Sequence, residues 1–343
     1  MIHYQKKERI AELKRTGRYE EALTLLTEII KETEKKAAKE HRSVDSWPYK
    51  EAAIVYRKLK DYEAEVAVLE RFATQHHSYS KQARGLLKRM KRAYQLAGLL
   101  EKRDGCLIHV GYGVPVDELP MIVGTAAFVD LETTGFAGHD ELIEIAIVLF
   151  RFNWVTGQVL GVVDSYVGLR EPTVPISPGA TRVHRITMAD VRGKQLNKEK
   201  VIELCQRADF LIAHNAGFDR RFLCALYPEL KGLTWACSMN GVKWKRKGFQ
   251  SKGLQNLLAD HGLTPNTAHR ALADVMAALD LLSQIDPQRG EPYLLELLDS
   301  RTARSEQRVN RSEQPPIITV TPMVKSPQRE GFWQRLIHWM MKR

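Results

Sequence analysis

The segment TAAFVDLETTG, residues 125–135, constrains the fold most, because an apolar run delivers two carboxylates at its end. Small and apolar residues at 125–129 are typical of a buried strand. Side chains alternate along a strand, so Asp130 and Glu132 share one face while Leu131 packs on the other. Two carboxylates this close raise each other's pKa, and the pair therefore needs a compensating cation, most simply a hard divalent ion such as Mg²⁺.

The length of 343 residues allows two or three domains. Its four cysteines lack C-x-x-C spacing, which predicts neither a disulfide framework nor a zinc site and favours a reducing, cytoplasmic location. The start of the chain is polar, and no apolar run approaches the roughly 20 residues of a membrane span. We therefore expect a soluble protein without a signal peptide.

The formal charge of +11 is distributed unevenly along the chain. Residues 1–100 carry +8, 101–120 carry −2, 121–286 carry +1 and 287–343 carry +4. Between Arg71 and Arg103 there are nine Lys or Arg against one Glu, with Tyr79 and Tyr94 interspersed. Such a surface suits a nucleic acid or an acidic protein, although solvated helix faces have the same composition.

Residues 1–103 are predicted to be an all-helical domain, since apolar residues recur at helical spacing and Pro48 is the one proline. Residues 13–26 and 56–69 align with Tyr19 on Tyr62, which resembles the turn and second helix of tetratricopeptide repeats. The copies are 43 residues apart instead of about 34, so a general array of helical hairpins is the firmer interpretation. Residues 104–120 contain three glycines and two prolines and are predicted to be a linker.

Residues 121–300 are predicted to be an α/β domain with a mostly parallel central sheet, because strand and helix patterns alternate. After the first strand, the expected strands are 141–150, 159–169 and 210–213. The expected helices are 197–208, with Asn197 as N-cap, 217–226, 251–261 and 268–285.

Two further aspartates occur where such a domain would place functional groups. Asp219 follows a strand in the sequence LIAHNAGFDRRFL, in the first turn of a helix, where an anion is favoured. Asp274 lies in AHRALADVMAALDLL, five residues after His269 at the start of that helix. Considered alone, Asp219 would be interpreted as a residue that interacts with the helix dipole, and Asp274 as a surface residue.

Taken together, the three motifs resemble the DEDDh exonuclease family, and in particular the proofreading subunit of bacterial DNA polymerase III and its relatives. The resemblance covers residues 123–285 and includes FVDLETTG, LIEIA, VHRIT, AHNAGFDRRFL, SKGLQNLLADHGL and HRALAD. It implies a ribonuclease H-like fold with a five-stranded mixed sheet, one strand antiparallel, and helices on both faces.

The family's chemistry implies a role for each acidic residue. Two divalent ions, Mg²⁺ or Mn²⁺, activate the attacking water and stabilise the leaving 3′ oxygen. By resemblance, Asp130 bridges both ions, Glu132 and Asp274 complete one coordination shell, and Asp219 acts through bound water. His269, with an ordinary pKa of about 6.5, is the expected general base.

The resemblance also implies contacts with the substrate strand. Thr133 and Thr134 are expected to meet the terminal nucleotide, and Asn215 to lie near the strand. Phe136 is a candidate wedge against the last base, with a core role equally plausible. Lys245 and Trp244 belong to a basic loop that is suited to bind a single-stranded nucleic-acid end. The same composition also occurs in exposed basic loops that bind no ligand.

The chain departs from the polymerase subunit at residues 235–239, WACSM, where an Asp-Thr pair is usual, which favours a free-standing relative. Residues 301–330 are predicted to be a flexible linker. Residues 331–343 are predicted to form an amphipathic basic helix. Such a helix suits a groove of a protein partner, an anionic membrane surface or its own chain, and we favour the protein partner.

The sequence thus predicts a metal-dependent 3′–5′ exonuclease that releases nucleoside monophosphates from single-stranded or frayed DNA, in replication or repair. RNA is the nearest alternative substrate, because no residue pattern indicates recognition or rejection of the 2′ hydroxyl. A binding adaptor with an incidental exonuclease domain is the alternative of another class.

Overall fold

The structure is a computed structural model, and it describes residues 2–40, 43–75, 81–103, 105–263 and 270–300. His269 and the predicted linker and terminal helix at 301–343 lie outside the described residues. Within the described part, no helix combines the length and apolar character needed to cross a membrane.

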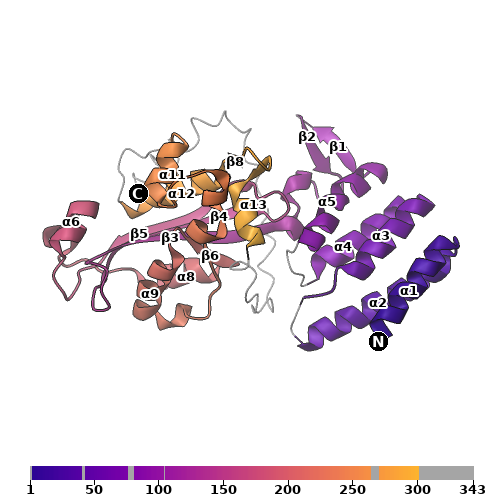
Figure 1. Cartoon of the computed structure of the whole chain (residues 1–343), viewed down its shortest axis with the longest axis horizontal. Helices are drawn as coiled ribbons and strands as arrows, with labels where there is room; N and C mark the ends of the chain where they lie inside the picture. The colour runs from indigo at the N-terminus through magenta and orange to yellow at the C-terminus, as the bar shows by residue number, and fades with distance from the viewer. Residues whose placement is uncertain (1, 41–42, 76–80, 104, 264–269, 301–343) are drawn as a thin grey trace. The chain divides into compact units, whose positions relative to one another are not determined.

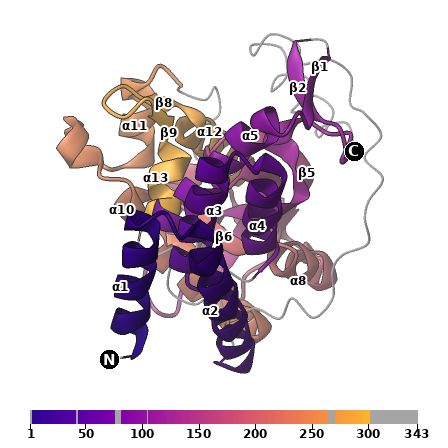
Figure 2. The ribbon, with the colours of Figure 1, turned by 90° about the vertical axis from the view of Figure 1, so that its right-hand side faces the viewer.

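Five helices form the N-terminal part, and each packs against the next (Figure 2). They are α1 (Ile2–Arg15), α2 (Tyr19–Glu40), α3 (Trp47–Leu59), α4 (Tyr62–Thr74) and α5 (Lys81–Leu96). Their apolar stripes meet in one core that contains Leu26, Ile29, Tyr49 and Phe72. Asp61 caps α4 by accepting a hydrogen bond from the Ala64 amide. The predicted helical-hairpin array is confirmed, and the tetratricopeptide assignment stays a prediction.

The segment predicted to be a linker, residues 104–120, contains short regular elements in its described part, residues 105–120. Strand β2 (Cys106–His109) pairs with β1 (Leu100–Arg103), so a hairpin replaces the end of the predicted helical segment. Two 3₁₀ turns follow, η1 (Val116–Glu118) and η2 (Pro120–Ile122). Val116, Leu119 and Ile122 are buried in the core of the helical part, because apolar residues three apart share one side of these turns.

The central sheet has five strands in the order β5-β4-β3-β6-β7. The strands are β3 (Val123–Thr133), β4 (Leu142–Asn153), β5 (Val159–Leu169), β6 (Phe210–Ala213) and β7 (Trp235–Cys237). Strand β4 runs antiparallel to β3 and β5, whereas β3, β6 and β7 are mutually parallel. This arrangement confirms the predicted mixed sheet with one antiparallel strand.

Helices cover both faces of the sheet (Figure 1). Those that follow the strands are α6 (Pro178–His184), α7 (Met188–Val191), α8 (Lys198–Gln206), α9 (Ala216–Leu226), α10 (Ser238–Gly241), α11 (Leu254–Asp260), α12 (Ala271–Ser283) and α13 (Tyr293–Asp299). The short elements η3 (Pro228–Leu230), η4 (Trp244–Lys247), β8 (Ile285–Asp286) and β9 (Glu291–Pro292) connect them. Asn197 caps α8 as predicted, accepting from the Lys200 amide at 2.9 Å.

The alternation along β3 decides which side chains meet which helices. Ala127, Val129 and Leu131 pack into the core that β3 shares with α8 and α9. Asp130 and Glu132 therefore project from the opposite face, against which α12 packs. The sheet thereby directs both carboxylates toward the helix that carries Asp274.

Candidate active site

Three of the predicted acidic residues converge at the end of β3. One carboxylate oxygen from each of Asp130, Glu132 and Asp274 lies within 4.8 Å of the other two. Asp274 comes from the first turn of α12 and is buried, while the other two are partly exposed. Hard divalent cations are coordinated by such sets of carboxylate oxygens, so these residues fit a divalent metal ion.

The electrostatics of this cluster show the need for positive charge. Burial, followed by repulsion from Asp219, Glu132 and Asp274, raises the pKa of Asp130 well above its ordinary range. Burial and repulsion from Asp274 and Glu144 raise the pKa of Glu132 to about 8. A cation among these oxygens removes the repulsion and favours the ionised carboxylates.

Asp219 is not among the three residues whose carboxylate oxygens lie within 4.8 Å of one another. It lies in the first turn of α9 and is 3% exposed. Burial raises its pKa, while hydrogen bonds with the backbone of Asp219 and Leu131 oppose that shift. Because the bond at Leu131 ties the side chain to β3, and its charge acts on Asp130, Asp219 belongs to the same site.

Glu144 is a further residue of the site, and the sequence patterns above predict no role for it. It lies opposite Glu132 in the β3–β4 register and is 1% exposed. Its carboxylate accepts from Arg270 Nη2 at 2.6 Å and from the Ala271 amide at 3.0 Å. Glu144 thereby anchors the start of α12, directly after His269. A charged residue inside the apolar strand LIEIA was the available signal.

Gln255 and His184 also support the site without having been singled out. Gln255 Nε2 donates to Asp274 Oδ1 at 2.8 Å and fixes that carboxylate. His184 is buried, and its Nε2 lies 3.2 Å from the Thr133 carbonyl oxygen at the end of β3. His184 lies in the segment VHRIT and Gln255 in SKGLQNLLADHGL, both of which carry the family resemblance, but their roles depend on contacts across the fold.

The turn after β3 is held by its own side chains. The Thr134 hydroxyl donates to Asp140 and accepts from the Glu141 amide, and the residue is fully buried. The Thr134 hydroxyl is therefore engaged within the turn, and the contact of its backbone with the terminal nucleotide stays a prediction. The Thr133 hydroxyl donates to the Gly135 carbonyl oxygen. A Cβ at Gly135 would meet Asp140 at 2.6 Å, so the turn requires glycine there.

Phe136 and Asn215 face solvent. Phe136 is 79% exposed, which excludes the alternative core role, and its ring lies 5.8 Å from that of Phe218. Arg221 Nη2 donates to the Phe136 carbonyl oxygen and ties the turn to α9. Asn215 is exposed at the N-terminus of α9, and its side chain makes no capping hydrogen bond there. Both side chains are thus accessible to a ligand.

Some side chains of the basic loop at 243–252 are buried, and others are exposed. Trp244 is fully buried against Tyr293, and its Nε1 donates to the Ser238 carbonyl oxygen at 2.9 Å. Its predicted stacking on a base is therefore wrong. Lys247 also points inward and pairs with Asp286 and Glu296. Lys245 is exposed, as its predicted role requires.

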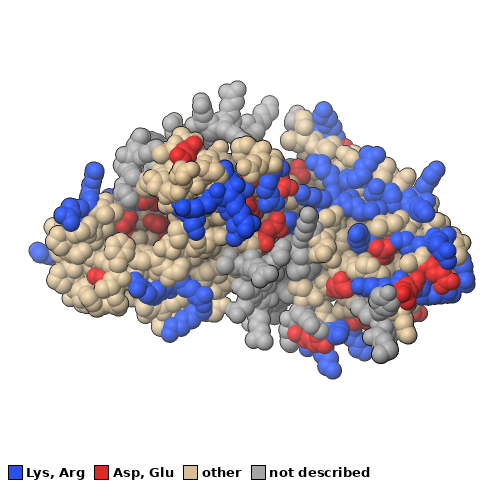
Figure 3. Space-filling model, viewed as in Figure 1, with Lys and Arg blue, Asp and Glu red and all other residues tan. Residues whose placement is uncertain are grey.

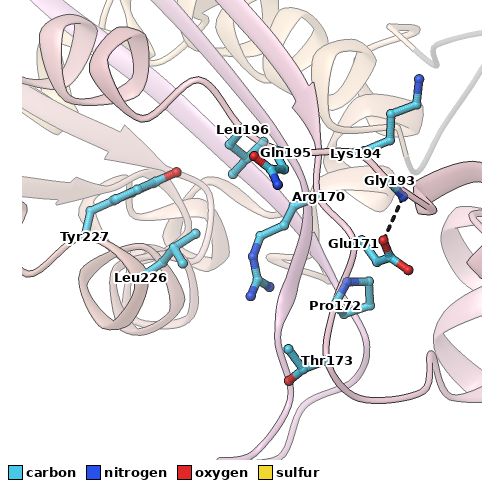
Figure 4. Close-up of a pocket in the computed structure, with 10 residues that line it drawn as sticks. All are labelled: Arg170, Glu171, Pro172, Thr173, Gly193, Lys194, Gln195, Leu196, Leu226 and Tyr227. Carbon is cyan, nitrogen blue, oxygen red and sulfur yellow. Dashed lines mark hydrogen bonds between the residues drawn. The ribbon is translucent and has the colours of Figure 1, made fainter.

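A separate hollow of about 490 Å³ lies beside the ends of β5 and α9 (Figure 4). Arg170, Lys194 and Tyr227 are among its lining residues, and Glu171 accepts a hydrogen bond from the Gly193 amide at its edge. None of the four predicted acidic residues lines it. It is therefore not the carboxylate site.

The comparisons with known proteins agree with this geometry. Residues 127–282 match the family model described as exonuclease. This match assigns an exonuclease domain to residues 127–282 of the chain. Exodeoxyribonuclease 10 of Escherichia coli (strain K12) is 34% identical over 164 residues, which is 46% of this chain and 66% of the relative.

Two other proteins each match about half of the chain. The DNA polymerase III subunit epsilon of Treponema pallidum (strain Nichols) is 29% identical over 163 residues, 45% of this chain and 73% of the relative. A solved exonuclease X in complex with 5′ overhanging duplex DNA covers 50% of this chain and 99% of its own, at 25% identity and a TM-score of 0.34. The helical part lies outside the family match.

Proposed function

We propose that this protein is a metal-dependent 3′–5′ exonuclease that removes nucleoside monophosphates from single-stranded or frayed DNA ends. The observation that carries the proposal is the convergence of Asp130, Glu132 and Asp274 within 4.8 Å, inside a domain of the exonuclease family. The DNA polymerase III subunit and the exodeoxyribonuclease among the relatives favour DNA as substrate and a role in replication or repair.

Mg²⁺, with Mn²⁺ as a substitute, is the proposed cofactor, held by Asp130, Glu132 and Asp274, with Asp219 close by. When bound, a pair of such ions offsets phosphate charge and makes water more acidic. The chain's own contribution is to hold these carboxylates together on β3 and α12, where Gln255 and Glu144 fix their positions.

His269 is the proposed general base. It immediately precedes Arg270, the N-cap residue of α12, and Asp274 lies in the first turn of the same helix. A neutral imidazole at that position accepts the proton of the attacking water. Substitution of His269 by Ala is expected to lower kcat by two orders of magnitude or more, in line with roughly 10²–10⁴-fold for general bases.

Phe136, Asn215, Lys245 and the backbone groups of Thr133 and Thr134 are the proposed substrate contacts. Phe136 is exposed beside Phe218 and suits stacking on the terminal base. Lys245 offers a cation for the phosphate backbone. Phe136→Ala should raise KM for a single-stranded oligonucleotide more than it lowers kcat.

Cleavage of a 3′-labelled oligonucleotide by purified protein with Mg²⁺ or Mn²⁺ tests the assignment. Asp130→Ala should reduce hydrolysis to background while the circular dichroism spectrum is unchanged. Asp260→Ala, an exposed aspartate on α11, serves as the control and should keep full activity. Undiminished activity of Asp130→Ala contradicts the proposal.

Matched DNA and RNA oligonucleotides in the same assay decide between the substrates. Faster cleavage of RNA would assign an exoribonuclease instead. Absence of cleavage of either strand with either metal would favour a binding adaptor. We also propose that residues 331–343 bind a protein partner.

A further inference from the structure

Helix α5 has two chemically different faces. Leu86, Leu87, Met90 and Tyr94 are buried in the core of the helical part. The helix contains six Lys or Arg and no acidic residue. Arg84 pairs with Asp299 and Arg89 with Glu65, while Lys88, Lys91 and Arg92 are exposed on the other face. Figure 3 shows Lys and Arg side chains gathered over this region. The amphipathic helix thus presents one strongly positive surface.

Three of these cations are spaced to point the same way. Lys88, Lys91 and Arg92 stand at positions i, i+3 and i+4 and are exposed. Lys88 pairs with Glu291 at 3.2 Å and Lys91 with Asp117 at 3.5 Å, and all four side chains are at least 31% exposed. Exposed pairs of this kind contribute little to stability, so a polyanion can replace them.

A series of ring contacts leads from α5 to an exposed aromatic ring. The ring of Tyr94 on α5 contacts His109 edge-on, with centroids 4.4 Å apart, and His109 in turn contacts Tyr112 at 4.9 Å. Tyr112 is 45% exposed. On the neighbouring hairpin, Lys102 is exposed as well. Basic side chains beside an accessible ring are typical of single-stranded nucleic acid sites.

We propose that Lys88, Lys91, Arg92, Lys102 and Tyr112, hereafter the α5 surface, form a second nucleic-acid contact outside the exonuclease domain. The polyanion is a nucleic acid strand, because exonucleases act on one and because residues 121–286 carry only +1 of the total charge. Lysine and arginine bind backbone phosphates without regard to sequence, while Tyr112 stacks on a base.

The α5 surface is tested by binding, independently of hydrolysis. The full chain with Asp130→Ala is titrated in EDTA against a fluorescein-labelled single-stranded oligodeoxythymidylate, and anisotropy is recorded at several salt concentrations. Adding Lys88→Gln, Lys91→Gln and Arg92→Gln should raise Kd at least several-fold. The slope of log K against log salt should shrink by about 2, since each lost phosphate contact of a single strand contributes about 0.7.

Lys35→Gln, Lys36→Gln and Lys39→Gln on α2 remove the same charge from exposed helical positions and form the matched control. This variant should bind as the parent does. Tyr112→Ala should weaken binding of the single strand but not of a blunt duplex. Equal losses in the α5 and α2 variants, or an unchanged Kd and salt slope in the α5 variant, overturn the proposal. Absence of hydrolysis by the wild-type chain would not change these binding results.

Discussion

A tryptophan between lysines can face solvent or the core, and Trp244 faces the core. Its ring lies 4.8 Å from Tyr293 and 5.8 Å from Phe249, and its indole N–H is bonded to a backbone carbonyl. Lys247, three residues on, is drawn inward by Asp286 and Glu296. The same alternation of basic and aromatic residues is compatible with an exposed or a buried tryptophan, so the sequence pattern alone could not predict the burial of Trp244.

Trp244→Ala is therefore expected to act on stability. Truncating a fully buried tryptophan typically lowers the free energy of unfolding by about 3–5 kcal/mol. Urea unfolding followed by circular dichroism measures this loss. Lys245→Ala, an exposed neighbour, should change stability by no more than about 0.5 kcal/mol. A wild-type unfolding midpoint for Trp244→Ala would contradict the burial of the ring.

At the level of elements, the position of α12 depends on one buried carboxylate. Glu144 on β4 accepts hydrogen bonds from the Arg270 side chain and the Ala271 amide, at the residue where α12 begins. The same helix carries Asp274, which Gln255 of α11 holds from the other side. The metal-binding geometry is thus fixed by contacts between a strand and two helices.

Glu144→Gln keeps the shape but removes the charge that holds Arg270. We expect a 10–100-fold loss of metal affinity or activity, the usual cost of removing a residue that orients metal ligands. Isothermal titration with Mn²⁺ and kcat at saturating metal measure the two quantities. Glu203→Gln on α8, which breaks surface pairs with Lys200 and Arg207, should leave both unchanged. Full metal affinity and activity in Glu144→Gln would refute the anchoring role.

For the whole molecule, metal and pH should act together on stability. The pKa of Glu132 is about 8 in the folded protein against an ordinary 4.5, so between these values the folded state binds more protons than the unfolded state. Without metal, this contribution to stability is complete below about pH 4.5 and is lost as pH rises through about 8. A cation compensates the loss, because it binds the deprotonated carboxylates.

The thermal midpoint should therefore rise more on adding Mg²⁺ at pH 8 than at pH 5.5. Differential scanning fluorimetry in EDTA and in excess Mg²⁺ measures the difference. The triple variant Asp130→Asn, Glu132→Gln, Asp274→Asn should show no shift with metal at either pH. Equal shifts of the wild-type midpoint at both pH values would argue against a carboxylate metal site.

Much of this fold was predictable, because it depends on patterns within short segments. Residues 159–169 and 210–213 are the strands β5 and β6 as predicted, and Asn197 caps α8. The order of the acidic motifs predicted four carboxylates, and the structure brings three of them within 4.8 Å of one another. The hairpin at residues 100–109 was missed, since four-residue strands leave little periodicity to detect.

By itself, the sequence determined four of the five strands and the faces of β3, because alternation is a local consequence of backbone geometry. The fifth strand and the identity of the acidic cluster were implied by the resemblance to the exonuclease family. Only the tertiary structure decided which polar residues support that cluster and which aromatic residues remain exposed. Glu144, Gln255 and Trp244 took their roles from neighbours distant in the chain, and burial depends on such neighbours.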